Sequence, residues 1–278
     1  MKAIFRHVAG SATGLLGLVL VAAIVFAAVT AEWISPYDPD RLDVLHRFAG
    51  ISGAHWLGTD HLGRDLLSRL LHGASVAMAV SLLAITMALS VGTVLGALAA
   101  YLPSGQERFI LVVFDIISSF PSLVLALVVV AVFGPSTVNV IVIVAVTLMP
   151  QFGRVARAQV LQVKSAPFLE AEILLGAGKL RIFFRHLLPN IAGPLIVLAS
   201  VEVPVVITVE AGLSFIGLGV RPPLASWGTL IYDGYSYLSD SALPVVASCV
   251  TLSLATLGFT LFGEALRDAV DPKRSSIR

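Results

Sequence analysis

The sequence is poor in charge and contains a single cysteine. Only 13% of its 278 residues are Asp, Glu, Lys or Arg, whereas 57% are hydrophobic. A soluble domain carries about 25% charged and about 45–50% apolar residues, so this composition excludes a soluble globular protein. The net charge of +1 excludes the basic excess that nucleic-acid binding requires. Cys249 stands alone, which excludes an internal disulfide.

The apolar residues that are present gather in six long runs. They cover residues 8–29, 75–102, 109–133, 137–152, 187–219 and 241–263. A bilayer-spanning helix needs about 20 apolar residues, so each run is a candidate span. A cleaved signal peptide is the alternative for the first run, but an apolar signal region has only about 7–15 residues. Gly134-Pro135 separates the third and fourth runs, which predicts a helical hairpin with a very short connection.

The basic residues indicate how these spans are oriented. If the amino terminus lies inside, 13 of the 18 Lys and Arg residues fall on the inner side. The positive-inside rule then predicts that both termini are cytoplasmic. We therefore expect an all-α polytopic membrane protein with six transmembrane helices, N-in and C-in. Residues 1–74 are expected to form the first span with an extracytoplasmic loop and an interfacial helix, and residues 75–278 a core of five spans.

The outer loop, from about residue 33 to residue 74, contains a helix signal and two histidines. Thr59 or Asp60 can cap a helix on which leucines recur at i+4 spacing, and such a helix is suited to the outer membrane interface. His55 and His61 could be read as metal ligands, but no ligand set with recognisable spacing surrounds them. We expect these histidines to cap helices or contact solvent, and we expect no metal site.

The inner loop, about residues 153–189, is longer than ordinary helix connections. Pro167 marks the start of one helix, with acidic residues in its first turns. Gly176 and Gly178 allow a turn, and a second helix over residues 179–188 is expected to end at Pro189. Charged and apolar residues alternate along this second helix. Such a hairpin is suited to docking into a groove on another protein, and the alternative is a hairpin that rests among lipid headgroups.

The spacing within this hairpin resembles the EAA loop of ATP-binding-cassette importer permeases. That pattern is Glu-Ala-Ala, three residues, Gly, nine residues, an apolar residue, one residue, Leu-Pro. The residues that match it or lie within it, and that the resemblance implicates in coupling to an ATPase, are Glu170, Ala171, Glu172, Gly176, Arg185, Leu188 and Pro189. Two positions depart from the pattern. Glu172 replaces the second Ala and His186 replaces the usual Ile, which alters the surface chemistry of the hairpin.

Other blocks narrow the resemblance to the dipeptide, oligopeptide and nickel permease branch of this family. They are residues 55–65, 119–121, 210–220, 222–223, 226–228 and 263–272, and they span nearly the whole chain. The resemblance implies a type I importer permease fold in the bacterial cytoplasmic membrane. It also implies a second homologous permease, two cytosolic ATPase subunits and an extracytoplasmic solute-binding protein as partners.

The sequence contains no phosphate-binding loop of its own. Gly178-Lys179 is followed by Leu180, and no glycine lies five residues before Gly178. We therefore expect no cofactor in this chain, and ATP and Mg²⁺ would be bound by the partner ATPases. The signatures His-Glu-x-x-His and Gly-x-Ser-x-Gly are also missing, which disfavours an intramembrane enzyme. An exporter and a passive channel remain rival interpretations.

Three acids lie within the apolar runs, where charge is costly and marks function by default: Asp115, Glu202 and Glu210. Glu202 and Glu210 are about 80° apart around a helix, so both can face one cavity. We predict that at least one faces the cargo pathway and attracts a cationic group. The alternative is a carboxylate satisfied by neighbouring helices or placed at the interface, which is favoured for Asp115. Peptide ranks first as cargo, and nickel or a metal chelate second.

Overall fold

A computed structural model describes residues 8–174, 176–178 and 181–270, with the backbone alone for Glu170, Ala171 and Ile173. Regular structure in these residues is helical. The helices are α2 (Ala12–Ile34), η1 (Val44–His46), α3 (Leu66–Ala99), α4 (Ser104–Ser118), α5 (Ser122–Phe133), α6 (Thr137–Lys164), α7 (Pro167–Leu174), η2 (Ile182–Leu187), α9 (Leu188–Phe215), α10 (Trp227–Ser236) and α11 (Leu243–Val270). The prediction of an all-α protein is confirmed.

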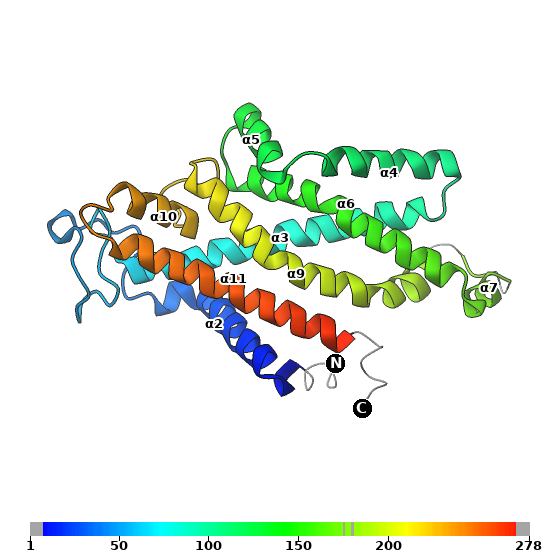
Figure 1. Cartoon of the computed structure of the whole chain (residues 1–278), viewed down its shortest axis with the longest axis horizontal. Helices are drawn as coiled ribbons and strands as arrows, with labels where there is room; N and C mark the ends of the chain where they lie inside the picture. Colours follow the sequence, from blue (N-terminus) through cyan, green and yellow to red (C-terminus); the bar gives the residue numbers. More distant parts are fainter. Residues whose placement is uncertain (1–7, 175, 179–180, 271–278) are drawn as a thin grey trace.

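Within the described residues, five helical segments are long and apolar enough to cross a membrane: α2, α3, α6, η2 joined to α9, and α11. The bent pair α4 and α5 makes a sixth if it is one crossing. When the bent pair is counted as a segment, successive segments run in opposite directions along the molecule (Figure 1). As a result, α2 begins and α11 ends in the half that carries α7, and the loop over residues 35–65 lies with α10 at the other end. This is the arrangement of a multi-pass membrane protein.

The third predicted span is not one straight helix. Its apolar run is divided into α4 and α5, whose axes meet at 87°. The break lies at Phe120-Pro121, because proline has no N–H to donate and disfavours helical geometry in the residue before it. After α5 the chain reverses at Gly134, whose φ of 82° suits glycine. The short connection predicted between the third and fourth runs is therefore present.

The second span begins earlier than predicted. The prediction of a separate interfacial helix before it is wrong, because these residues belong to the span itself. One continuous helix of 34 residues, α3, starts at Leu66. Its N-terminal cap is Asp65, whose carboxylate accepts a hydrogen bond from Ser68 N at 2.8 Å, and not Thr59 or Asp60. The boundary predicted after residue 74 falls inside this helix.

Two further helices extend beyond their predicted ends. Helix α6 continues twelve residues past position 152 to Lys164, so the first part of the predicted inner loop is helical. The helix expected to stop at Pro189 instead continues through η2 into α9. In η2 the Leu188 N–H donates to Phe183 O, the wider i→i+5 pattern, and Pro189 then lies in the first turn of α9. Proline cannot donate to a carbonyl of the preceding turn, and the wider turn lies directly before it in this otherwise continuous helix.

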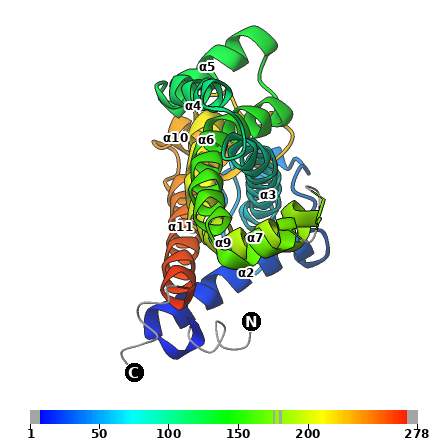
Figure 2. The ribbon, with the colours of Figure 1, turned by 90° about the vertical axis from the view of Figure 1, so that its right-hand side faces the viewer.

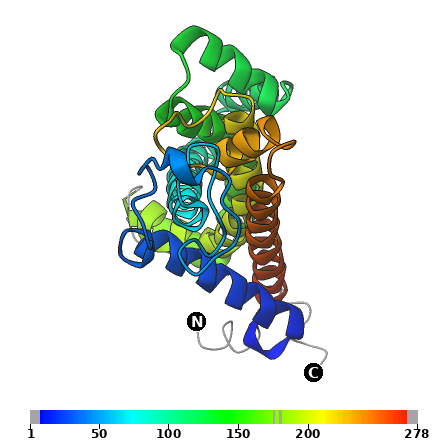
Figure 3. The ribbon, with the colours of Figure 1, turned by 90° about the vertical axis from the view of Figure 1, so that its left-hand side faces the viewer.

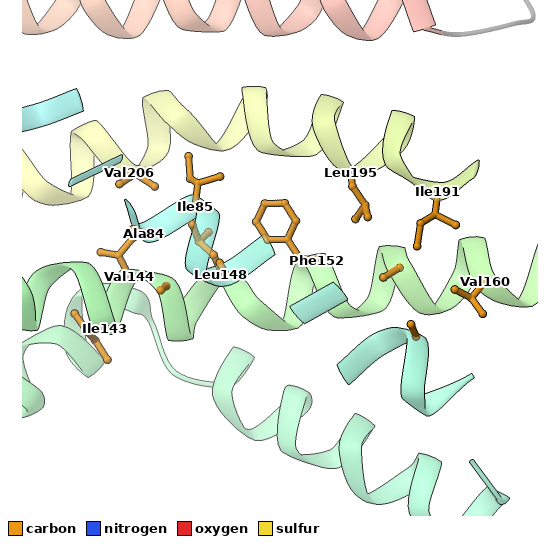
Figure 4. Packing of buried hydrophobic residues seen from close by; sticks show 14 of the residues in the cluster. Ala84, Ile85, Ile143, Val144, Leu148, Phe152, Val160, Ile191, Leu195 and Val206 are labelled. Atoms are coloured by element: carbon orange, nitrogen blue, oxygen red, sulfur yellow. The ribbon is translucent and has the colours of Figure 1, made fainter. Parts of the chain in front are cut away.

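The core lies between α3, α6 and α9. Figure 4 shows Ile85 of α3, Phe152 of α6 and Leu195 of α9 pointing toward one another. Glycines let α3 and α6 approach closely, because a Cβ at Gly96 would overlap the carbonyl oxygen of Gly153. The shared packing ties α6, which leads to the predicted coupling loop, to the centre of the molecule.

Candidate functional site

The hairpin between α6 and α9 projects at one end of the molecule. Figure 2 shows α7 lying across the ends of α6 and α9. Leu169 is buried in the core and holds α7 against the bundle. Phe168, Leu174 and Phe184 are 47%, 87% and 62% exposed. The hairpin therefore offers large apolar side chains that the described chain does not cover, which is the property expected of a docking surface.

A turn with a left-handed residue connects the two arms of the hairpin. Gly176 has φ of +80°, and Ala177 N donates to Glu172 O at 3.0 Å. The following glycine, Gly178, accepts a hydrogen bond from Ile182 N at 3.0 Å. The turn predicted at these glycines is present. Gly176 is the position that requires glycine, because a Cβ would clash with the backbone at this φ.

The predicted coupling residues are distributed over both arms of this hairpin. Glu170 and Ala171 belong to α7, and their side chains lie outside the described residues. Arg185 is exposed on η2, Leu188 is half-buried and Pro189 is exposed at the start of α9. Their coupling role stays a prediction.

The two residues that depart from the EAA pattern contact each other. Glu172 Oε1 lies 3.6 Å from His186 Nε2, and the two side chains are 36% and 19% exposed. This contact joins α7 to η2 across the turn. The pattern predicts an apolar packing position here, and this chain has a polar pair instead.

The two buried acids of α9 lie in different surroundings. Glu202 is 6% exposed, and its carboxylate lies near the side chain of Gln151 of α6. Glu210 is fully buried, and its Oε1 accepts a hydrogen bond from Ser214 Oγ at 2.7 Å. The same hydroxyl oxygen accepts from Val220 N at 3.0 Å, which ties the end of α9 to the loop that follows. Oε2 of Glu210 has no hydrogen-bond partner among the described residues.

The third candidate, Asp115, lies on α4 and forms an ion pair. Its Oδ1 accepts from Arg154 Nη2 of α6 at 2.9 Å, and the aspartate side chain is 69% exposed. Asp115 thus differs from the two glutamates of α9, because it lies on another helix and pairs with an arginine. Whether any of the three acids lines a cargo pathway stays a prediction.

A buried ionic cluster holds the loop over residues 35–65 against α3 and α10. Arg64 Nε donates to Asp60 Oδ2 at 2.6 Å, and another nitrogen of its guanidinium lies 3.5 Å from Asp233 of α10. Arg69 of α3, also buried, lies 3.6 Å from the same Asp60 oxygen. Figure 3 views this end of the molecule, with the loop beside α10. The block at residues 55–65 is therefore a structural brace.

The titratable groups of this brace respond to their burial. Burial lowers the pKa of His61, and the carboxylates of Asp233 and Asp60 oppose this effect. Burial raises the pKa of Asp233, and His61 and Arg64 oppose that shift. Both groups are thus held near opposite charges that offset part of the cost of burial.

The histidines of the loop contact different partners and form no shared site. His55 Nδ1 lies 2.8 Å from Asp65 Oδ1, at the cap of α3. His61 stacks on the ring of Tyr237, with centroids 4.8 Å apart. Within the ranges that the structure covers, no group of three metal-ligating side chains is found.

Sequence reasoning missed the contacts made by the basic residues of α6. Arg154, Arg157 and Lys164 were placed in a cytoplasmic loop, but they lie on the helix and contact α3 and α4. The spacing of three residues between the two arginines could have indicated that the helix continues, because it puts both on one face.

The fold and the hairpin together define a multi-pass membrane protein with an exposed apolar hairpin at one end, the class to which transporter permeases belong. The chain belongs to the family described as binding-protein-dependent transport system inner membrane component, whose profile matches residues 92–276. Residues 4–50 match the N-terminal transmembrane domain of oligopeptide transport permease C. The family consists of transporter subunits, so the chain is not classed as an enzyme.

Curated relatives align over almost the entire chain. The di/tripeptide transport system permease protein DppC of Pseudomonas aeruginosa is 38% identical over 275 residues, covering 97% of this chain and 90% of its own. The glutathione transport system permease protein GsiD of Pectobacterium atrosepticum is 36% identical, covering 98% and 89%. The nickel transport system permease protein NikC of Escherichia coli is 34% identical, covering 92% and 93%.

Among solved structures, a chain of the MetNI methionine ABC transporter in an inward-facing conformation has a similar fold. Its TM-score is 0.60 at 19% identity, and the match covers 74% of this chain and 98% of that one. At this identity the similarity supports the importer permease fold that the sequence predicted.

Proposed function

We propose that this chain is the permease subunit of an ATP-driven importer that carries small peptides into the bacterial cytoplasm. The observation that carries the proposal is the agreement between the family, which spans residues 92–276, and the projecting hairpin at the position of the EAA pattern. Several relatives are named for dipeptides, tripeptides or glutathione, which share a peptide backbone.

The proposal includes partners of four kinds. A second, homologous permease completes the membrane part, and two cytosolic ATPases bind ATP and Mg²⁺ and dock on the hairpins. An extracytoplasmic solute-binding protein delivers the cargo, and the lipid bilayer of the bacterial cytoplasmic membrane surrounds the helices. Both termini are cytoplasmic in this arrangement, on the side of α7. The exposed Phe168, Leu174 and Phe184 support the docking step, because apolar side chains on a water-facing hairpin are stabilised by a partner groove.

We propose alternating access as the mechanism. Closure of the ATPase dimer displaces α7, and the displacement reorients α6, which is joined to α7 by two residues, and α9, which follows α7 through the turn and η2. Within the pathway, Glu202 and Glu210 are the acids that would attract a cationic group, such as the amino terminus of a peptide. The nickel permease among the relatives supports nickel or a metal chelate as the second candidate cargo.

Purification and reconstitution test the function. The chain is tagged, isolated with the proteins that accompany it, and reconstituted into proteoliposomes with the solute-binding protein encoded beside it. We expect two ATPases and a second permease to co-purify, and ATP to drive dipeptide uptake. Flux that needs neither ATP nor binding protein would indicate a channel, and outward flux an exporter. Uptake of nickel without uptake of peptide would establish the second candidate.

A further inference from the structure

Two ion pairs join α4 to the half of α6 that leads into α7. Arg157 Nε of α6 donates to Glu107 Oε1 of α4 at 2.8 Å, and a second guanidinium nitrogen contacts the same oxygen. About one turn away, Arg154 Nη2 donates to Asp115 Oδ1 at 2.9 Å and to Ser118 Oγ at 3.1 Å. The pairs thus contact both ends of α4.

A third basic residue of α6 holds the end of α3. Lys164 Nζ donates to Ala100 O at 3.2 Å and lies 4.7 Å from the centre of the Tyr101 ring. The carbonyl is at the C-terminal end of α3, where a cation is favoured by the helix dipole. The three basic residues of α6, Arg154, Arg157 and Lys164, therefore contact α4 and the turn between α3 and α4.

Close packing supports the ion pairs between α4 and α6. Phe114 of α4 is fully buried, and a Cβ at Gly153 of α6 would overlap its ring. Figure 1 and Figure 2 both show α4 alongside α6. At its other end, α4 meets α5 at a sharp bend of 87°. Because of that bend, α5 does not continue the axis of α4, so the position of α4 depends on its contacts with α6 and α3.

The two pairs differ in their shielding from solvent. The side chains of Arg157 and Glu107 are 29% and 24% exposed, whereas those of Arg154 and Asp115 are 46% and 69% exposed. An exposed ion pair contributes little to the free energy of unfolding, whereas a shielded charge that loses its partner destabilises a protein in or near a membrane. The Arg157–Glu107 pair therefore carries more of the interaction.

We propose that Arg157 and Glu107 are positioning residues that fix α4 to α6, so that a displacement of α7 moves the α3–α4 turn together with α6. The inference rests on the proposed function, because it assumes that α7 receives the movement of the ATPases. Arg154 and Asp115 form the second, weaker attachment of the same pair of helices. Asp115 acts in this attachment through its ion pair.

Charge neutralisation, followed by exchange of the two charges, tests the transport consequence in the reconstituted complex. We expect Glu107→Gln and Arg157→Gln to assemble normally and to lower uptake per ATP hydrolysed by about five-fold or more, the size of a typical coupling effect. The exchange Glu107→Arg with Arg157→Glu should restore uptake to near the wild-type value. Arg108→Gln is the matched control, because Arg108 is exposed on the same helix and makes no ion pair within the described chain. Normal coupling in both single variants would overturn the proposal, as would an exchange variant no better than the single ones.

A distance measurement tests the attachment without relying on transport. Spin labels are placed at the exposed Phe109 of α4 and Leu161 of α6, in a Cys249→Ser background. We expect one narrow distance distribution that is the same with and without ATP, and a broadened one in Glu107→Gln. An unchanged width in Glu107→Gln would overturn the proposal even if uptake falls. A wild-type complex that shows the narrow distribution but no ATP-driven import would contradict the proposed function alone.

Discussion

Gly176 fixes the geometry of the coupling hairpin through its backbone. Its φ of +80° is strained for any residue with a Cβ, because the Cβ would meet the adjacent backbone, yet no atom beyond the two neighbouring residues lies within 4 Å of where that Cβ would be. A substitution there changes the turn and leaves the packing untouched.

We expect Gly176→Ala to cost about 1–2 kcal/mol at the turn and to reduce ATP-driven uptake, because a non-glycine residue disfavours the left-handed region. Gly178→Ala is the matched control, since Gly178 has equally open surroundings and no positive φ. Uptake and ATP hydrolysis are measured in proteoliposomes. Equal activity of the two variants would show that the turn geometry is not needed for coupling.

The acids of α9 differ in what their neutralisation should do. If Glu202 attracts a cationic group of the cargo, Glu202→Gln should lower uptake by about ten-fold, or about 1.4 kcal/mol. Glu210 is fully buried and hydrogen-bonds with Ser214 near the end of α9. Glu210→Gln therefore tests, at a second position, whether a buried acid of α9 serves the cargo pathway. Glu264→Gln, on the exposed face of α11, is the control. Normal peptide uptake by both glutamine variants would refute the prediction that either acid serves the pathway.

At the residue scale, the sequence predicted the turn at Gly176 because glycine marks left-handed positions by its chemistry. It did not predict the contact between Glu172 and His186, because the EAA pattern describes each position separately. Only the fold brings residues fourteen positions apart to 3.6 Å. The partners of Arg154 and Arg157 were missed for the same reason.

At the scale of single elements, the start of α3 depends on Asp65. Its carboxylate accepts from both Ser68 N and Ser68 Oγ at 2.8 Å and contacts His55. We expect Asp65→Ala to destabilise the protein by about 1–2 kcal/mol and to lower its Tm, because the helix loses its cap. Thermal unfolding in detergent measures the effect. Arg41→Ala, at an exposed position in the same loop, should leave the Tm unchanged. A Tm for Asp65→Ala equal to that of the wild type would contradict this role.

The contact between α3 and α6 depends on the absence of side chains. Gly96→Leu would force the two helices apart, because even a Cβ at this position overlaps the backbone of Gly153. We expect the free energy of unfolding to fall by about 3 kcal/mol or more, because overpacking costs about 1–3 kcal/mol even where neighbours can shift. The effect would be seen as a low yield of folded protein. Gly212→Ala on α9 meets nothing within 4 Å and should express normally. A stable Gly96→Leu protein would show that α3 and α6 can separate.

The apolar runs predicted where helices lie, because lipid-facing helices must be apolar along their length. They could not predict the bend between α4 and α5, since hydropathy does not change across Phe120-Pro121. The proline was the available signal. They also placed the end of α6 too early, because its last turns carry charge that ends a run but not a helix.

At the scale of the whole molecule, the alternation of helix directions separates two ends. The loop over residues 35–65 lies at one end and α7 at the other (Figure 1). The distribution of basic residues predicts that the end with α7 is cytoplasmic.

Thiol labelling in cells measures this orientation. In a Cys249→Ser background, Leu45→Cys and Leu174→Cys place single thiols at residues that are 94% and 87% exposed, at opposite ends. We expect a membrane-impermeant maleimide to label position 45 in intact cells and position 174 only after lysis. The reverse pattern would establish the opposite topology, and labelling of both in intact cells would contradict a multi-pass arrangement with separated ends.

The length of α6 has a mechanical consequence. Its 28 residues, at about 1.5 Å each, make a rod about 42 Å long, whereas the hydrocarbon core of a bilayer is about 30 Å thick. An upright α6 therefore extends about 12 Å beyond the core in total, whereas the headgroup region on each side is only about 5–8 Å thick. Because α7 follows the end of α6 after two residues, it lies outside the hydrocarbon core. If an ATPase docks on α7 as proposed, it binds outside the hydrocarbon core, and a displacement of α7 would tilt α6 within the membrane.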